Sequence, residues 1–205
     1  MSNDEPPPDQ PARSLGPFYA WRRGWPLPPV ATRLDAPLVV ESPMVPDGPL
    51  GDIPPDEVAG RLADGHALFR ALVDGELAAY GWSASERAHI GGLDLAFAIP
   101  PGERYLWDFA TMPAYRGRGI YPLLLQAILR RQSDVAEGFW IGHDPSNHGS
   151  RRGILKAGFQ TAGHIWQLTD GALAVVGAPD VEAEVARRGA AVLGLPFLAA
   201  PPDST

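Results

Sequence analysis

The sequence predicts an α/β (α+β) fold in which strands and helices alternate along one chain. Three observations support this prediction. Residues 105–112 are mostly apolar and predict a strand, and a glycine-rich turn follows them. Residues 121–131 are then apolar almost all round, which is typical of a buried helix. Further upstream, Asp74-Gly75 joins two loosely alternating stretches and predicts a β-hairpin.

The first part of the chain differs in composition from the rest. Residues 1–14 are rich in proline and poor in apolar groups, so we expect a disordered tail. Residues 15–35 are expected to form an arm that packs on the domain, because aromatic side chains are unlikely to stay in water. These aromatics are Phe18, Tyr19, Trp21 and Trp25. Residues 36–200 are predicted to form the globular domain.

Within that domain the elements follow from periodicity and from turn residues. The predicted strands are residues 37–42, 66–73, 76–82, 92–99, 105–112 and 138–142. A helix is predicted for residues 54–63, where Val58 and Leu62 are four positions apart. The helix of residues 121–131 contains Pro122 near its start. Proline is tolerated in a first turn, so this helix is expected to begin near Arg118 or Gly119.

Composition favours a small enzyme and excludes several kinds of chemistry. The chain has 205 residues, of which 45% are hydrophobic, enough for one core. It has no apolar run of about 18 residues, so no membrane span is expected. The acidic, proline-rich N-terminus does not resemble a secretory signal, and we expect a cytoplasmic protein. The absence of cysteine excludes disulfides, thiolate metal sites and a cysteine nucleophile.

Charge is distributed unevenly. The net charge of −7 argues against nucleic acid as a partner. The segment from Ala114 to Lys156, however, contains seven basic and three acidic residues, so its local charge is +4. Such a basic segment is suited to a phosphorylated ligand.

The turn Tyr115-Arg116-Gly117-Arg118-Gly119-Ile120-Tyr121 is the strongest candidate for the phosphate site. A glycine-rich turn that ends a strand and opens a helix directs free backbone N–H groups and the positive end of the helix dipole at one point. A dinucleotide fingerprint would need a third glycine where Pro122 stands, and a nucleotide-triphosphate loop would need Gly-Lys, but the only lysine is the distant Lys156. A plain surface turn is the remaining alternative.

Two motifs together resemble the GNAT N-acetyltransferase superfamily. Residues 116–121 resemble its motif A, Gln/Arg-x-x-Gly-x-Gly/Ala, with Arg116 and Gly119 matching and Tyr121 standing where Gly or Ala is usual. Residues 147–159 resemble its motif B, in which an Asn is followed by a Ser, a basic residue and Gly-Phe. The matching residues are Asn147, Ser150, Lys156, Gly158 and Phe159.

The resemblance implies a fold, a cofactor and a reaction. The expected fold is a mixed, twisted central sheet of about 6–7 strands with helices on both faces. The expected reaction transfers acetyl from acetyl-coenzyme A to a primary amine in a ternary complex. The strand before the loop should part from the next strand and hold the pantetheine arm. The cofactor-binding residues that this implies are Phe109, Ala110, Thr111, Arg116, Gly117, Arg118, Gly119, Ile120, Tyr121 and Asn147. Asn147 is equally suited to be a helix N-cap.

The motifs lack the residues that usually transfer protons in this superfamily. Many members of the superfamily carry Tyr where this chain has Ile154, and some carry Glu where it has Gly142. Asp108 resembles an acidic residue that lies near the amine in polyamine-type members, and His143 carries an imidazole, a group suited to proton transfer. Strict alternation would turn Asp108 away from Tyr105 and Trp107, and a bulge would reverse this. Both residues are catalytic candidates.

The acceptor site is predicted from aromatic residues. Tyr105, Trp107 and Trp82 are the candidate substrate-binding residues, and their enclosure favours a small, partly apolar amine. The predicted partner is a small-molecule amine, without nucleic acid, a membrane or a metal, and a homodimer is compatible with the sequence. Because both usual proton-transfer positions are lost, a coenzyme A-binding sensor or interaction module without turnover is the alternative.

Overall fold

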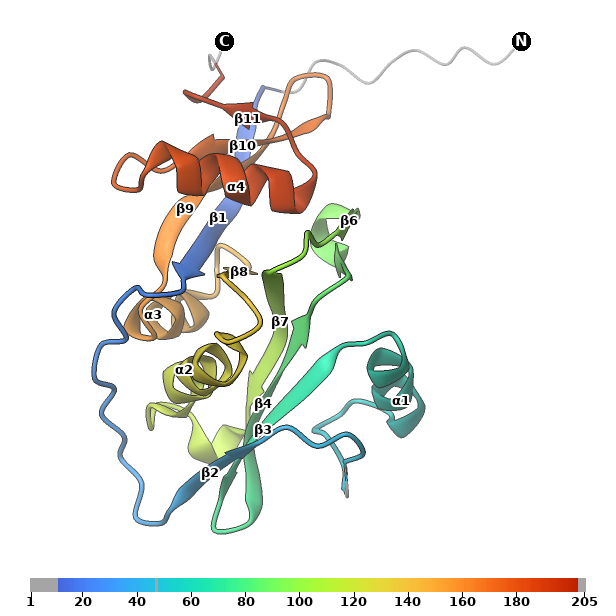
Figure 1. Ribbon diagram of the computed structural model, residues 1–205, viewed down its shortest axis with the longest axis vertical. Helices are drawn as coiled ribbons and strands as arrows, with labels where there is room; N and C mark the ends of the chain where they lie inside the picture. Colours follow the sequence, from blue (N-terminus) through green and yellow to red (C-terminus); the bar gives the residue numbers. More distant parts are fainter. Residues whose placement is uncertain (1–10, 47, 203–205) are drawn as a thin grey trace.

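The computed structural model describes residues 11–46 and 48–202, so most of the expected N-terminal tail lies outside it. Nine strands form one sheet in the order β11-β10-β9-β1-β8-β7-β4-β3-β2 (Figure 1). The pairs β7–β8 and β10–β11 are parallel and the other neighbours are antiparallel. The predicted mixed sheet is therefore confirmed, with nine strands in place of the six or seven expected.

The elements follow one another along the chain as strands separated by helices. The strands of the large sheet are β1 (Arg13–Arg22), β2 (Leu38–Glu41), β3 (Ala67–Val73), β4 (Glu76–Ala84), β7 (Glu103–Thr111), β8 (Gly138–Gly142), β9 (Gln160–Gln167), β10 (Leu173–Gly177) and β11 (Phe197–Leu198). The α-helices are α1 (Pro55–Ala63), α2 (Ile120–Gln132), α3 (His148–Lys156) and α4 (Ala183–Leu193). Two 3₁₀ turns, Gly91–Leu93 and Pro113–Tyr115, complete the order. Among the described residues, no helix is long and apolar enough to cross a bilayer.

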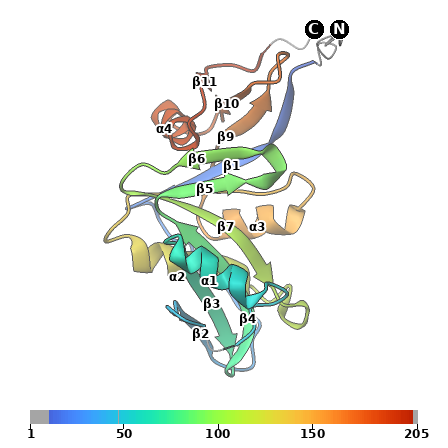
Figure 2. The same ribbon diagram turned by 90° about the vertical axis from the view of Figure 1, so that its right-hand side faces the viewer.

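A separate hairpin, β5 (Arg87–Ile90) with β6 (Leu95–Ala98), lies over the large sheet (Figure 2). The predicted strand of residues 92–99 corresponds to β6 and is thus outside the large sheet. Phe97 of this hairpin packs edge-on against Tyr105 of β7, at 5.2 Å between ring centroids. The hairpin therefore covers the first half of β7.

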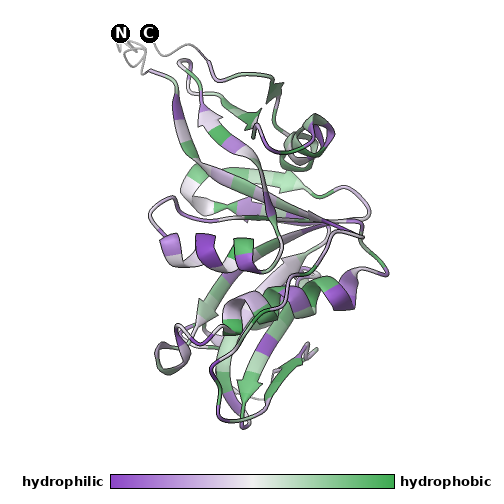
Figure 3. Cartoon of the chain, turned by 90° about the vertical axis from the view of Figure 1, so that its left-hand side faces the viewer, coloured by the Kyte–Doolittle hydropathy of each residue, from purple (hydrophilic) through white to green (hydrophobic). Residues whose placement is uncertain are grey.

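Helices cover both faces of the sheet, as predicted. One face packs on α2 and α3, and α1 lies on the other side (Figure 1). The core beneath α2 contains Leu106, Leu125 and Phe139. The opposite face carries α1, α4 and the β5–β6 hairpin, and its core contains Trp82 and Trp140. Figure 3 shows more hydrophobic residues along α2 than along α3, which agrees with the deeper burial of α2.

The strand β1 corrects the predicted arm. Residues 13–22 lie inside the sheet between β8 and β9, with Phe18 opposite both Gly142 and Gly163. Phe18 and Tyr19 are each only 1% exposed and point to opposite faces of the sheet. Phe18, Tyr19 and Trp21 are thus buried within a central strand, because both faces of the sheet at this position are covered, whereas Trp25 follows the strand and is partly buried. The expected disorder of residues 1–14 is wrong for Arg13 and Ser14, which begin β1.

The predicted hairpin turn is confirmed. Val73 pairs with Glu76, so Asp74 and Gly75 form a two-residue loop. Their φ angles are 53° and 81°, the left-handed values that a turn matching the twist of the strands requires.

Candidate functional site

A loop with exposed backbone amides connects β7 to α2. Gly117 and Gly119 have φ angles of 74° and 83°, a conformation that glycine adopts without steric cost. In the described part of the chain, the backbone N–H groups of Gly117, Arg118 and Gly119 donate to no protein acceptor. The helix begins at Ile120, one or two residues later than predicted, and its positive end faces the same loop. The loop has the geometry of an anion cradle.

The linker between β1 and β2 forms one wall of this cradle. Arg33 donates its backbone N–H to the carbonyl oxygen of Arg118 at 3.1 Å. A Cβ atom on Gly119 would lie 2.5 Å from the carbonyl oxygen of Ala31, whereas one on Gly117 would meet no atom within 4 Å. Gly119 is therefore needed for packing against the linker, and Gly117 faces open space. The side chain of Arg116 is directed back to the strand and donates to the carbonyl oxygen of Thr111 at 3.1 Å.

Tyr121 points away from the cradle into the contact between α2 and α3. Its ring lies 5.4 Å from the ring of Phe109 and against Gly153, which has no side chain to occupy that space. Its hydroxyl lies 3.3 Å from Ser150 Oγ. Burial raises the pKa of Tyr121 far above its usual value, and the bond to Ser150 opposes the increase. The large residue at this motif position is thus accommodated by a glycine on the facing helix.

The two parallel strands part next to this loop. β7 pairs with β8 only as far as Leu106 opposite Ile141, while its pairing with β4 continues to Thr111. Phe109, Ala110 and Thr111 therefore lie beyond the end of the β7–β8 pairing. Strands that part in this way leave backbone groups on one edge free to bind an extended ligand.

A β-bulge lies at the same point of β7. Trp107 is opposite Trp82 and Ala110 is opposite Tyr80, so two residues of β7 oppose Gly81 alone. Asp108, the first of the two, has a φ of 48°. Phe109 then covers Gly81, where a side chain would overlap its ring. The bulge turns Asp108 toward α1, where Arg61 Nη1 contacts its Oδ2 at 2.5 Å.

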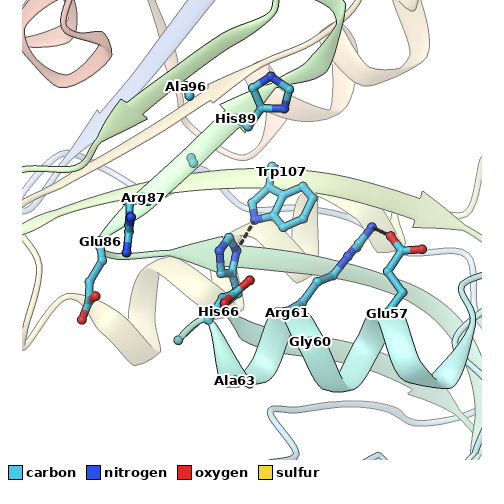
Figure 4. Close-up of a pocket in the computed structure, with 13 residues that line it drawn as sticks. Glu57, Gly60, Arg61, Ala63, His66, Glu86, Arg87, His89, Ala96 and Trp107 are labelled. Carbon is cyan, nitrogen blue, oxygen red and sulfur yellow. Dashed lines mark hydrogen bonds and ion pairs between the residues drawn. The ribbon is translucent and has the colours of Figure 1, made fainter.

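A cleft of about 940 Å³ opens on the face of the sheet opposite the cradle. It lies between α1, the turn after α1 and the β5–β6 hairpin, with Trp107 from β7 at its base (Figure 4). Its charged and imidazole-bearing lining residues are Glu57, Arg61, Asp64, His66, Glu86, Arg87 and His89.

Arg61 is fixed at the base of the cleft. Its guanidinium carbon lies 5.1 Å from the ring centroid of Trp82 and 4.5 Å from that of Trp107. Its two terminal nitrogens contact Glu57 and Asp108, at 2.6 and 2.5 Å. A cation held over two neighbouring aromatic rings and against two carboxylates is both oriented and neutralised. Arg61 therefore adds little free positive charge to the cleft.

His66 is a hydrogen-bond donor of the cleft, and it was not among the residues selected from the sequence. The indole N–H of Trp107 donates to His66 Nδ1 at 3.1 Å (Figure 4). Because an indole only donates, Nδ1 carries no proton, and the neutral ring must carry its proton on Nε2. Burial lowers the pKa of His66, which favours this neutral form. In this tautomer His66 offers an N–H group and has no free lone pair with which to act as a base.

The burial of His66 predicts a pH dependence of stability. Its pKa is lowered in the folded protein, so the unfolded chain binds a proton first as the pH falls. This contribution to stability is complete above the unfolded pKa of about 6.5 and is lost progressively below it. We expect His66→Gln, which keeps an acceptor for Trp107, to reduce the loss of unfolding free energy between about pH 7 and 5. Urea denaturation at several pH values measures this, with His148→Gln on the exposed start of α3 as the control.

The remaining predicted residues lie on or beneath these two regions. Tyr105 and Trp82 are 5% and 0% exposed and support the base of the cleft without lining it. His143 follows β8, and its Nε2 lies 3.0 Å from the hydroxyl of Tyr19. Asn147 is the N-cap of α3, where its Oδ1 accepts the backbone N–H of Ser150 at 2.9 Å.

Comparison with known proteins identifies the family. The family model described as "Acetyltransferase (GNAT) family" matches residues 39–159, more than half of the chain, and the chain belongs to this family. The match includes the cradle, the bulge and α3, but not β1. No curated protein matches the chain.

Several solved structures are similar to the chain. A GCN5-related N-acetyltransferase from Kribbella flavida is 14% identical, with 74% of this chain and 56% of that chain covered and a TM-score of 0.46. A GNAT-family acetyltransferase from Colwellia psychrerythraea is 13% identical, with 78% and 57% covered and a TM-score of 0.49. The aminoglycoside acetyltransferase AAC(6')-Iy, in complex with a bisubstrate analog, is 15% identical, with 61% and 92% covered and a TM-score of 0.44. The chain thus spans little more than half the length of the first two.

Proposed function

We propose that this protein is an N-acetyltransferase that transfers acetyl from acetyl-coenzyme A to a primary amine in a ternary complex. The observation that carries the proposal is the parting of β7 from β8 after Leu106. The cradle lies next to this gap on one face of the sheet, and the cleft beside Trp107 lies on the other. A pantetheine arm that passes through the gap would bring its thioester from the first site to the second.

The cofactor would be held by backbone groups. The free N–H groups of the cradle suit the pyrophosphate, because backbone donors at a helix N-terminus bind anions without a dedicated side chain. Phe109, Ala110 and Thr111 would pair with the amides of the pantetheine arm. Asn147 is occupied as an N-cap through Oδ1, so only its amide N–H groups remain for the cofactor.

The charge of the cleft favours a cationic acceptor. Glu57 and Asp108 neutralise the positive charge of Arg61. The other carboxylate and guanidinium residues that line the cleft are two acids, Asp64 and Glu86, and one base, Arg87. An alkylammonium group is attracted to this excess of carboxylate. His66 would donate a hydrogen bond from Nε2 to a hydroxyl or carbonyl oxygen of the same substrate. The substrate class is therefore a small amine that also carries an oxygen acceptor.

Asp108 is the residue that we assign to the amine itself. It lies in the bulge where the strands part, and Arg61 engages only its Oδ2. Oδ1 would accept a proton from the ammonium, the amine nitrogen would attack the thioester carbon, and the carbon–sulfur bond would break to release the coenzyme A thiolate. The amide nitrogen would lose its second proton to water. General-base catalysis of this kind contributes about 10²- to 10⁴-fold.

The test is release of coenzyme A in the presence of amines. The chain contains no cysteine, so a thiol reagent gives no background signal from the protein. We expect release that depends on the amine, and we expect Asp108→Asn to lower kcat at least tenfold while coenzyme A affinity, measured by calorimetry, stays unchanged. Asp134→Asn, at an exposed carboxylate after α2, is the matched control. Equal kcat values for the two variants would remove Asp108 from the mechanism.

A non-catalytic coenzyme A-binding module is the second candidate. It is favoured by Tyr121, which fills the space between Phe109 and α3, and by Ile154, which is fully buried and has no ionisable group. The same assay separates the two functions, because tight binding without thiol release across a broad amine panel supports the module.

A further inference from the structure

A tyrosine and a histidine form a hydrogen-bonded pair at the end of β8. The hydroxyl of Tyr19 lies 3.0 Å from His143 Nε2, and the two rings are stacked with 5.4 Å between centroids and 22° between planes. Tyr19 belongs to β1, which lies outside the residues matched by the family model. A strand that is additional to the matched domain therefore brings a phenol to the site.

The hydrogen bonds of His143 define the direction of this contact. Its Nδ1 lies 2.7 Å from the backbone carbonyl oxygen of Asp144, and a carbonyl only accepts. Nδ1 therefore carries a proton, and in the neutral ring Nε2 accepts the hydroxyl hydrogen of Tyr19. When the ring takes a second proton, Nε2 becomes a donor to the phenol oxygen. The phenol hydrogen is then released to another acceptor.

The position of the pair suits a leaving thiolate. Tyr19 is opposite Ile141 in the sheet, and Ile141 is the last residue of β8 that pairs with β7. His143 follows two residues later. The pair thus lies at the end of β8, beside the gap through which the proposed pantetheine arm would pass. Tyr19 is 1% exposed, so its proton is shielded from bulk water.

The charged and titratable groups around the pair come from three elements. The carboxylate of Asp144 lies next to the imidazole, and Arg151 of α3 lies near the phenol. Tyr121 of α2 is the other neighbouring phenol. Burial raises the pKa of Tyr19, and Arg151 opposes this increase by its charge and a hydrogen bond. Arg151 would therefore stabilise a transient phenolate at Tyr19.

We propose that Tyr19 passes a proton from the His143 imidazolium to the sulfur of coenzyme A. The proposal rests on the proposed acetyl transfer. As the carbon–sulfur bond breaks, the thiolate takes the hydroxyl hydrogen of Tyr19, and Tyr19 takes the Nε2 proton of His143. The products are the neutral thiol, the neutral phenol and the neutral imidazole. The imidazole is then reprotonated from solvent, so no further reactant is needed.

Other residues near the gap are less suited to this step. Ile154 has no proton to give. The hydroxyl of Tyr121 is bonded to Ser150, which is not a proton source at neutral pH, and burial raises the pKa of Tyr121 far above its usual value. Tyr19 alone among these residues is hydrogen-bonded to an imidazole, a group that can both accept and donate a proton.

The first experiment compares Tyr19→Phe with the wild type under saturating acetyl-coenzyme A. We expect kcat to fall about 10²-fold, the lower range for general-acid catalysis, with coenzyme A affinity and melting temperature unchanged. Thr161→Val is the matched control, since it removes the hydroxyl of the residue opposite Tyr19 on the neighbouring strand β9, and we expect its kcat to equal that of the wild type. A kcat for Tyr19→Phe within twofold of the wild type would overturn the relay.

The second experiment gives a readout that a merely structural tyrosine would not affect. Wild-type kcat should decrease at high pH as the imidazolium of His143 is lost, and this limb should be absent from the profiles of Tyr19→Phe and His143→Gln. His164→Gln, on the neighbouring strand β9, should retain it. A Tyr19→Phe profile with the same limb overturns the relay but leaves the acetyl transfer intact. A wild type that binds coenzyme A and releases none overturns both.

Discussion

Replacement of Glu103 by alanine is expected to lower the free energy of unfolding by about 3–5 kcal/mol. Glu103 begins β7 and is 1% exposed. Its carboxylate receives Arg22 Nη1 at 3.0 Å, Arg188 Nε at 2.7 Å and the indole N–H of Trp140 at 2.6 Å. Three donors from β1, α4 and β8 thus converge on one buried acid.

The expected loss is large because three partners would be left together. Removal of the carboxylate leaves two guanidinium groups close to each other without their counter-charge, and it leaves the buried indole of Trp140 without an acceptor. It also removes the side-chain contact between Arg22 of β1 and Glu103 of β7. Residue 138 must be glycine for the carboxylate of Glu103 to fit, since any side chain there would overlap it.

The matched control is Glu137→Ala. Glu137 pairs with Arg23 at 3.1 Å, but the two side chains are 63% and 49% exposed, and such surface pairs contribute about 0–1 kcal/mol. Urea denaturation of both variants measures the difference. If the two variants lose the same unfolding free energy, the buried carboxylate has no special structural role. The stability of this region would then come from its apolar contacts alone.

The parts of the fold that were predictable have local causes. The Asp74-Gly75 turn depends on the φ angles of two adjacent residues, and α2 depends on a continuous run of apolar residues after a glycine turn. By contrast, β1 pairs with strands more than 100 positions away, as in the pairing of Phe18 with Gly142. It is buried on both faces, so it has no polar alternation from which a strand could be recognised.

The same distinction applies to the candidate site. The cradle was predictable because it is one contiguous loop. His66 was not, because its role depends on the indole of Trp107, 41 residues away. The orientation of Asp108 depends on a bulge opposite Gly81, which strict alternation does not reveal. Tyr121 was recognised as unusual, yet its orientation depends on Gly153 of another helix.

In the cradle, we expect Gly117→Asp to abolish most coenzyme A binding and Gly117→Asn to retain it. Gly117 has a φ of 74°, and a Cβ atom there would meet nothing within 4 Å. Asn and Asp both tolerate this conformation better than other residues, so the two variants share the same backbone cost. They differ in one negative charge placed among the free N–H groups.

A unit charge about 5 Å from a phosphate costs about 1–3 kcal/mol in a partly solvated site, which corresponds to an affinity ratio of about 5- to 150-fold between the two variants. Calorimetric titration with coenzyme A measures the ratio, and it should decrease at high ionic strength because salt screens the repulsion. Gly119 cannot provide this test, because its substitution would also displace Ala31 of the linker. Equal affinities for the Asp and Asn variants would show that the pyrophosphate binds elsewhere. The proposed route of the pantetheine arm from the cradle to the cleft would then be contradicted.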